Sequence, residues 1–89
     1  MKIVFLKSFL NDIKRVKDKK LKSKIKELIL EIEYAESMEA LTNVKKMKGY
    51  PSAYRVRVGN YRMGMYKETD SVELARILKR NDIYKVFPK

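Results

Sequence analysis

The sequence predicts an α+β fold in which a small antiparallel β-sheet carries two N-terminal helices on one face, in the order β-α-α-β-β-β. Apolar residues recur at helical spacing between positions 9 and 32, whereas residues 53–80 show the alternation or continuous apolar character of strands. A length of 89 residues with 45% hydrophobic side chains is typical of a domain with one core. We therefore expect residues 1–89 to form a single domain.

The N-terminal third is predicted to hold one strand and two helices. The apolar run at residues 2–6 is typical of a buried strand. Ser8 can cap a first helix, whose apolar side would carry Phe9, Leu10, Ile13 and Val16. A longer second helix follows, because its apolar residues fall at i, i+4, i+7, i+8 and i+11 and form one stripe: Leu21, Ile25, Leu28, Ile29 and Ile32.

The middle of the chain is predicted to add one helical turn at residues 37–41 and a short strand that ends at Gly49. Four apolar residues of this segment are expected in the core: Met38, Leu41, Val44 and Met47.

Residues 53–67, AYRVRVGNYRMGMYK, are predicted to form a hairpin around Gly59 and Asn60. In this register Val58 pairs with Tyr61 and Arg57 with Arg62. Side chains alternate between the two faces of a strand, so one face is apolar and carries Tyr54, Val56, Val58, Tyr61, Met63 and Met65. The opposite face, called the arginine face below, carries Arg55, Arg57 and Arg62 together with Gly64 and Tyr66.

Stability does not explain the arginine face, because like charges opposite each other on a sheet are destabilising. No acidic residue occurs in residues 40–67, which also contain Lys45, Lys46, Lys48 and Lys67. We interpret the face as a site where guanidinium groups hold phosphate oxygens, with Gly64 leaving room for a nucleotide backbone. The alternative is a solvated strand face on which arginine stems cover apolar surface.

The C-terminal third is predicted to continue the sheet with a strand in residues 71–80, buried on both faces. The register of this strand is open, so either Arg76 or Lys79 could join the arginine face. Arg80, at the strand end, is expected near its rim. Tyr84 follows four residues later and is either an ordinary rim tyrosine or a residue that stacks on a base or orients a hydroxyl.

The composition of the chain favours some classes of function and argues against others. The net charge of +11 and the isoelectric point near 9.9 favour a polyanionic partner. The absence of cysteine and histidine argues against disulfides, thiolate zinc sites and a histidine base, and we expect no metal and no cofactor. No apolar stretch is long enough to span a bilayer, and Lys7 interrupts the first ten residues where a signal peptide would be apolar. We expect a cytoplasmic protein without a membrane partner.

The segments NVKKMKG, YRVRVGNYRMGMY and ILKRNDIYKVFP together resemble the RelE/ParE superfamily of toxins from toxin–antitoxin systems. The resemblance implies a small antiparallel sheet with a concave basic face. It also implies a RelE-type endoribonuclease that enters the ribosome and cuts messenger RNA by attack of a ribose 2′-hydroxyl on the adjacent phosphate. By resemblance, Arg62 would neutralise charge on the phosphorane, Arg80 would aid leaving-group departure and Tyr84 would orient the substrate. Arg55 and Arg57 complete the active set.

The sequence departs from the family pattern in two respects. In the best-known member lysines stand where this chain has Arg55 and Arg57, and a lysine can serve as a base whereas an arginine essentially cannot. The 2′-hydroxyl would then need activation by Tyr84 or by ribosomal RNA. Many relatives also carry histidine where this chain has Lys79. Lys45, Lys46, Lys48 and Lys79, with Arg55 and Arg57, are the residues expected to bind nucleic acid.

Two other functions stay open at this point. One is a ParE-type toxin that inhibits DNA gyrase. The other is a basic module that binds nucleic acid without cutting it. In that case substitution of Arg57 and substitution of Arg80 would lower the affinity by equal amounts. A toxin also implies a cognate acidic antitoxin, which is expected to cover the arginine face or displace the segment that carries Tyr84. The free protein is expected to be a monomer.

Overall fold

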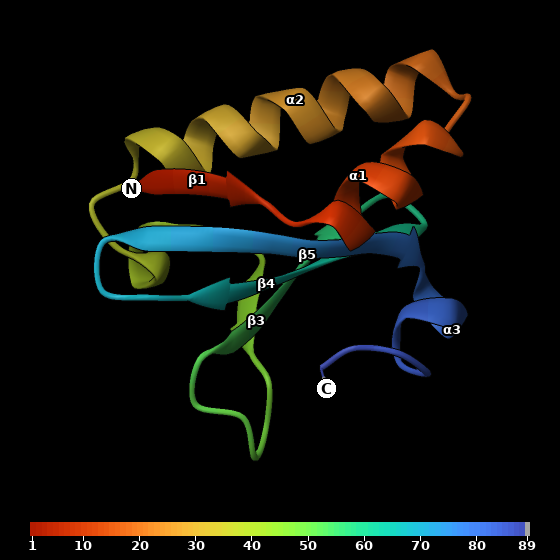
Figure 1. Ribbon diagram of the computed structural model, residues 1–89. Helices are drawn as coiled ribbons and strands as arrows, with labels where there is room; N and C mark the ends of the chain where they lie inside the picture. The colour runs from red at the N-terminus through yellow and green to blue at the C-terminus, as the bar shows by residue number, and fades with distance from the viewer. Residues whose placement is uncertain (89) are drawn as a thin grey trace.

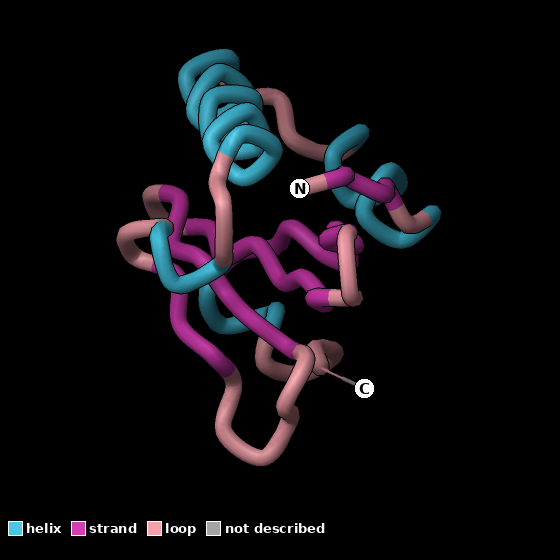
Figure 2. The backbone as a smooth tube through the Cα atoms, turned by 90° about the vertical axis from the view of Figure 1, so that its left-hand side faces the viewer, coloured by secondary structure: helices cyan, strands magenta, loops and turns pink. Residues whose placement is uncertain are grey.

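The computed structural model describes residues 1–88. Its elements are β1 (Lys2–Phe5), α1 (Lys7–Lys14), α2 (Lys19–Tyr34), the 3₁₀ turn η1 (Met38–Ala40), β2 (Val44–Lys46), β3 (Ala53–Val58), β4 (Tyr61–Lys67), β5 (Ser71–Lys79) and α3 (Arg80–Ile83). The strands form one sheet in the order β1-β5-β4-β3-β2. Helices α1 and α2 lie on one side of this sheet, and α3 with the C-terminal segment lies on the other (Figures 1 and 2).

The predicted α+β class with two N-terminal helices is confirmed, but the sheet is mixed. The pairs β2–β3, β3–β4 and β4–β5 are antiparallel, whereas β1 pairs in parallel with β5, from Lys2 opposite Ser71 to Phe5 opposite Leu74. The two parallel strands are not connected directly, because both helices and strands β2, β3 and β4 lie between them in the chain. None of the helices within residues 1–88 has the length and apolar content needed to cross a bilayer.

The prediction of a buried strand at residues 2–6 is wrong, because β1 lies at the edge of the sheet. Ile3 and Val4 are half-buried and Phe5 is 46% exposed. An apolar run has the same appearance in the sequence whether its strand is central or at an edge that a helix covers only in part. The place of β1 in the sheet is set by its pairing with β5, which lies almost seventy residues away in the chain.

Helix α1 begins without a side-chain cap. Leu6 occupies the N-cap position, and Ser8, which the sequence predicted as the cap, lies inside the helix. The Ser8 hydroxyl instead donates to the Ala75 carbonyl at 2.6 Å. Phe9 and Val16 are buried as predicted, whereas Leu10 is 43% exposed and does not belong to the core.

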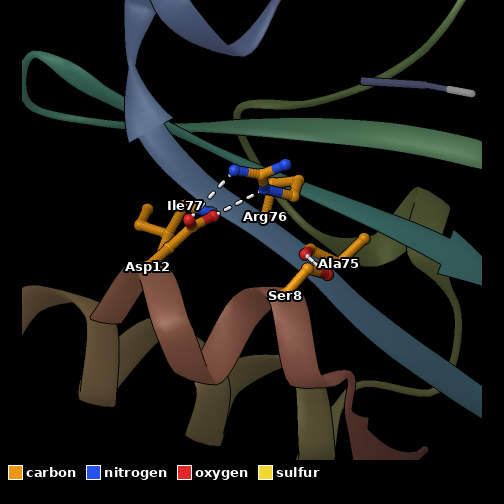
Figure 3. A network of polar contacts seen from close by, with 5 residues as sticks. All are labelled: Ser8, Asp12, Ala75, Arg76 and Ile77. Atoms are coloured by element: carbon orange, nitrogen blue, oxygen red, sulfur yellow. Dashed lines mark hydrogen bonds and ion pairs between the residues drawn. The ribbon is translucent and has the colours of Figure 1, made fainter. Parts of the chain in front are cut away.

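One side of α1 continues the edge of the sheet where β1 stops. Figure 3 shows Ser8 and Asp12 projecting from α1 toward β5. The Asp12 carboxylate accepts from the Ile77 backbone N–H at 3.1 Å and from Arg76 at 2.7 and 3.0 Å. A helix thus satisfies backbone groups of β5 that would otherwise form an open edge.

Helix α2 carries the predicted apolar stripe on the core. Leu21, Ile25 and Ile32 are buried, and Leu28 and Ile29 are partly buried against the same cluster. Asp18 caps the helix and accepts from the backbone N–H groups of residues 20 and 21 at 2.9 and 3.3 Å, a favourable placement of an acidic side chain at a helix N-terminus.

The segment after α2 agrees in outline with the prediction. The helical turn is η1, and Met38 is buried in the main core with Leu41 and Val44 packed against it. Strand β2 ends at Lys46, three residues before the predicted end at Gly49. Gly49 lies in a turn with φ of +83°, a conformation that suits glycine and ends a strand.

The predicted hairpin register is confirmed at every pair from Val58 opposite Tyr61 to Arg55 opposite Gly64. Gly59 has a φ of +58° in the turn. Strand β5 is a central strand with Val72, Leu74 and Ile77 almost fully buried, as the continuous apolar run predicted.

A second, smaller apolar cluster, which the sequence analysis did not predict, lies on the face of the sheet opposite α2. It consists of Ala53, Ala75, Ile83 and Phe87. A Cβ added to Gly64 would lie 2.6 Å from Phe87 Cδ2. The space over Gly64 is therefore filled by Phe87, and the expectation that a nucleotide backbone approaches there is wrong. The reason is that the C-terminal segment buries its own apolar side chains on this face.

Candidate functional site

An open cleft of about 410 Å³ lies where the β3–β4 turn meets the end of β5 and the start of α3. Eight residues line it: Arg57, Gly59, Asn60, Arg62, Lys79, Arg80, Asn81 and Asp82. Four of these side chains are cationic and one is a carboxylate. The cleft is called the basic cleft below.

Arg57 and Arg62 form the wall that the hairpin contributes. They are directly opposite each other in the β3–β4 register, so their side chains leave the same face of the sheet. Arg57 is exposed, whereas Arg62 is only 7% exposed. Arg62 Nη1 donates to the carbonyls of Gly59 at 3.2 Å and Tyr61 at 3.0 Å. These two bonds hold the Arg62 guanidinium in place at the base of the turn.

The Arg62 side chain also carries an unsatisfied donor. Its Nε–H is buried and has no hydrogen-bond partner among residues 1–88. A buried donor without a partner costs about 1–3 kcal/mol. This cost is similar in size to the gain from the two Nη1 hydrogen bonds, so we expect the Arg62 guanidinium to add little to the free energy of unfolding.

Lys79 and Arg80 line the basic cleft from the end of β5 and the start of α3. Lys79 is the last residue of β5 and lies opposite Tyr61, and Arg80 is the first residue of α3. The Arg80 backbone N–H donates to the Asn60 carbonyl at 3.0 Å. This bond ties the start of α3 to the hairpin turn and brings residues 57, 62 and 80 to one cleft.

Arg55 and Tyr84 lie together beside the basic cleft. The guanidinium carbon of Arg55 is 5.7 Å from the centre of the Tyr84 ring, an arrangement suited to cation–π attraction. Tyr84 is 47% exposed, so its remaining surface is open to a ligand. Lys45 is opposite Arg55 in the β2–β3 register and therefore shares its face.

The other predicted cations are not part of this arrangement. Lys46 is opposite Tyr54, which packs on the main core, so Lys46 leaves the sheet on the helix side. Together with Lys48 it lines a shallow hollow beside Tyr50 in the loop that extends from β2 and β3. Arg76 is on the arginine face by register, opposite Gly64, but its guanidinium is held by Asp12.

Sequence reasoning missed two features of the molecule, one in the basic cleft and one on the helix side of the sheet. One is Asp82, which lines the basic cleft from the first turn of α3; its place two residues after Arg80 was the available signal. The other is an apolar groove of about 470 Å³ between β1, α1 and α2, where Phe5, Leu10 and Leu30 are 43–46% exposed and Lys22 and Lys26 stand alongside. Within residues 1–88 there is no group of three or more acidic side chains placed to hold a metal ion.

Comparison with known proteins gives consistent matches along the chain. The family model described as "ParE toxin of type II toxin-antitoxin system, parDE" matches residues 3–84. Toxin RelE3 of Methanocaldococcus jannaschii is 40% identical over 89 residues, which span 99% of this chain and 100% of that protein.

Two solved structures extend the comparison to the fold. The toxin of the RelB-RelE antitoxin-toxin complex from Methanococcus jannaschii matches with a TM-score of 0.81 and 38% identity, over 96% of this chain and 99% of that chain. The YoeB dimer from Staphylococcus aureus matches with a TM-score of 0.69 and 24% identity, over 85% and 92% of the two chains. At that identity the second match bears on the fold alone.

Proposed function

The chain belongs to the RelE/ParE superfamily of toxins from type II toxin–antitoxin systems, and from this premise we propose that it is a ribosome-dependent endoribonuclease that cleaves messenger RNA. The observation that carries the proposal is the basic cleft, in which Arg57, Arg62 and Arg80 converge from separate elements. Identity of 40% to a RelE toxin over the whole chain favours the RelE type.

In the proposed reaction a ribose 2′-hydroxyl attacks the adjacent phosphate, and the arginines stabilise the charge that develops. Arg57 is exposed and would grip phosphate oxygens of the incoming strand. Arg62 is fixed by two carbonyls before any substrate arrives, so it would meet the pentavalent phosphorane without reorganisation, which is the most effective form of electrostatic stabilisation.

Arg80 and Tyr84 would act at the two ends of the bound dinucleotide. Arg80 lines the basic cleft with Arg57 and Arg62 and would stabilise the departing 5′-oxygen. Tyr84 exposes about half of its surface beside Arg55 and would stack on a base or orient a hydroxyl, since base stacking on tyrosine is a common mode of single-strand RNA recognition. Lys45, Lys79 and Arg55 would contact the backbone on either side.

The test is a translating extract to which the purified protein is added, with messenger RNA ends mapped by primer extension. New ends are expected only when ribosomes are present. Arg62→Ala and Arg80→Ala are expected to lower the cleavage rate by about 10²–10³-fold, as for loss of a transition-state donor, with most of the ribosome affinity retained. If the native protein cleaves nothing, and Arg62→Ala and Arg80→Ala lower its affinity for ribosomes by equal amounts, the protein is a passive basic module instead.

Inhibition of DNA gyrase is the second candidate, because the matching family model is described as a ParE toxin. A supercoiling assay run beside the translation assay separates the two targets. Inhibited supercoiling with intact messenger RNA would assign the protein to the ParE type.

The cognate antitoxin would be acidic, and two surfaces of the toxin suit it. Its binding would cover the basic cleft or displace the α3 segment that carries Tyr84. A second segment of the antitoxin would occupy the apolar groove. Its apolar side chains would pack on the exposed Phe5, Leu10 and Leu30, and its acidic side chains would pair with Lys22 and Lys26. The solved RelB-RelE complex supports a protein antitoxin for this chain.

Hydrogen exchange and proteolysis of the complex test the antitoxin proposal. Protection of the first two turns of α2 is expected, together with a change at residues 80–84: slower exchange if the antitoxin covers the basic cleft, or faster exchange and proteolysis if it displaces α3. A complex in which both regions stay as accessible as in the free toxin would refute it.

A further inference from the structure

The basic cleft raises a question that arginine cannot answer, namely which group removes the proton from the 2′-hydroxyl. A lysine at the position of Arg55 or Arg57 could serve as a base. An arginine there cannot, because its guanidinium stays protonated. The chain has no histidine. Tyr84, another candidate within the protein, has its ring beside the Arg55 cation rather than within the lining of the cleft. Lys79 does line the cleft, but it is opposite Tyr61 in the β4–β5 register, and Tyr61 packs on the main core at the helix side of the sheet.

We propose that Asp82 is the general base of the cleft, an inference that rests on the ribonuclease function proposed above. Asp82 is the one carboxylate among the eight residues that line the basic cleft. It lies in the first turn of α3, two residues after Arg80, and its side chain is exposed. A carboxylate at such a position is within the class of groups that enzymes use for this proton transfer.

The local fold gives Asp82 a fixed place. The next residue, Ile83, is 1% exposed and packs with Phe87 on the sheet. Successive side chains on a helix are about 100° apart, so Asp82 does not share the buried position of Ile83; it is exposed and lines the cleft. The Arg80 N–H bond to the Asn60 carbonyl fixes the other end of the same turn.

The Asp82 carboxylate is also available as a proton acceptor. No side-chain hydrogen bond or ion pair to it occurs among residues 1–88, although four cations line the same cleft. The contrast with Asp12 is informative, since that carboxylate accepts three hydrogen bonds from β5. Asp12 therefore stabilises the edge of β5, whereas the Asp82 carboxylate has no partner of this kind in the cleft.

The chemistry balances without a cofactor. The Asp82 carboxylate takes the proton of the 2′-hydroxyl as the 2′-oxygen forms a bond to phosphorus. The bond between phosphorus and the 5′-oxygen breaks, its electron pair goes to the 5′-oxygen, and that oxygen takes a proton from water. The products are a 2′,3′-cyclic phosphate and a 5′-hydroxyl, and Asp82 returns its proton to solvent.

The direction in which Asp82→Asn changes the cleavage rate distinguishes a general base from a residue without a catalytic role. A negative charge in a phosphate-binding cleft weakens RNA binding by simple repulsion. If Asp82 were only a solvated residue of α3, its replacement by asparagine would leave cleavage unchanged or raise it. If Asp82 is the base, the same change would improve binding and yet slow the chemical step.

The experiment compares the native protein, Asp82→Asn, Asp82→Gly and the matched control Asp70→Asn in single-turnover cleavage on programmed ribosomes. Asp70 is exposed and lies at the opposite end of β5. We expect Asp82→Asn to lower the single-turnover rate about 10²–10⁴-fold, the usual contribution of a general base, with ribosome affinity equal or tighter. Formate is expected to restore part of the rate to Asp82→Gly and none to Asp82→Asn, and Asp70→Asn is expected to cleave as the native protein does.

Native cleavage that persists at the same rate in Asp82→Asn would overturn the assignment of Asp82 and leave the proposed function standing. Absence of cleavage by the native protein itself would overturn both. Loss of rate accompanied by a lower melting temperature in Asp82→Asn, with no formate rescue of a folded Asp82→Gly, would identify a structural role and also refute the proposal.

Discussion

Replacement of Arg62 by methionine is the sharpest test of the division between folding and function in this protein. Arg62→Met removes one hydrogen bond to the Tyr61 carbonyl and one to the Gly59 carbonyl, which is exposed and can bind water instead. A hydrogen bond from a charged group contributes about 1.5–3 kcal/mol. The substitution also removes a buried, unpartnered Nε–H, which costs about 1–3 kcal/mol, and the repulsion from Arg57, worth some tenths of a kcal/mol.

These contributions have opposite signs and similar size, so we expect the free energy of unfolding to change by no more than about 1 kcal/mol. For a domain of this size, 1 kcal/mol corresponds to a shift of about 4–8 °C in Tm. Cleavage on programmed ribosomes is expected to fall by at least about 10²-fold, because the fixed guanidinium is lost from the transition state. Thermal unfolding and single-turnover cleavage measure the two effects on the same preparation.

Arg76→Met is the matched control, since it makes the same substitution at an arginine of the same face. There the change leaves the Asp12 carboxylate, 4% exposed, with the Ile77 N–H as its remaining donor. Removal of one partner of such a buried pair costs about 3–5 kcal/mol. The reasoning would be refuted if Arg62→Met unfolded the protein as Arg76→Met does, or if a folded Arg62→Met cleaved at the native rate.

Three further substitutions test the packing and the partner surface. Gly64→Ala is expected to lower the free energy of unfolding by about 1–3 kcal/mol in urea titration, because the added Cβ would lie 2.6 Å from the Phe87 ring and force it to move; unchanged stability would mean that Phe87 packs elsewhere. Ser8→Ala is expected to cost about 0.5–1.5 kcal/mol through the lost bond to the Ala75 carbonyl, and a stabilised variant would contradict the role given to Ser8. Leu30→Glu is expected to weaken antitoxin binding by calorimetry at least tenfold, about 1.4 kcal/mol, with cleavage unchanged; native affinity would place the antitoxin outside the apolar groove.

The local parts of the fold could be predicted because their signals are local. The hairpin register follows from the alternation on both sides of Gly59, and the α2 stripe follows from spacing within one helix. The parallel pairing of β1, the bond from Ser8 to β5 and the filling of the space over Gly64 all depend on residues more than twenty positions apart in the chain. No pattern within one element carries that information.

The candidate site divides in the same way. The sequence placed Arg57 opposite Arg62 from strand alternation alone, and the structure agrees. It could not place α3, because the four-residue helix is positioned by Ile83 and Phe87 packing on a face that alternation marked as polar. The convergence of Arg80 on the hairpin, and with it the inclusion of Asp82, therefore needed the tertiary structure.

The distribution of partners among the cations explains why the basic cleft can bind a polyanion at all. The chain carries 22 basic and 11 acidic residues, yet within residues 1–88 one ion pair forms, and it holds Arg76 against the edge of β5. The four cations of the basic cleft face a single carboxylate, so their charge is not neutralised internally. Cations in a cleft focus the field on an approaching phosphate more strongly than the same cations on a flat strand face. Arg62 is held in this cleft by the Gly59 and Tyr61 carbonyls and has no carboxylate partner among residues 1–88, so its charge stays available to a phosphate, whereas the charge of Arg76 is neutralised by Asp12.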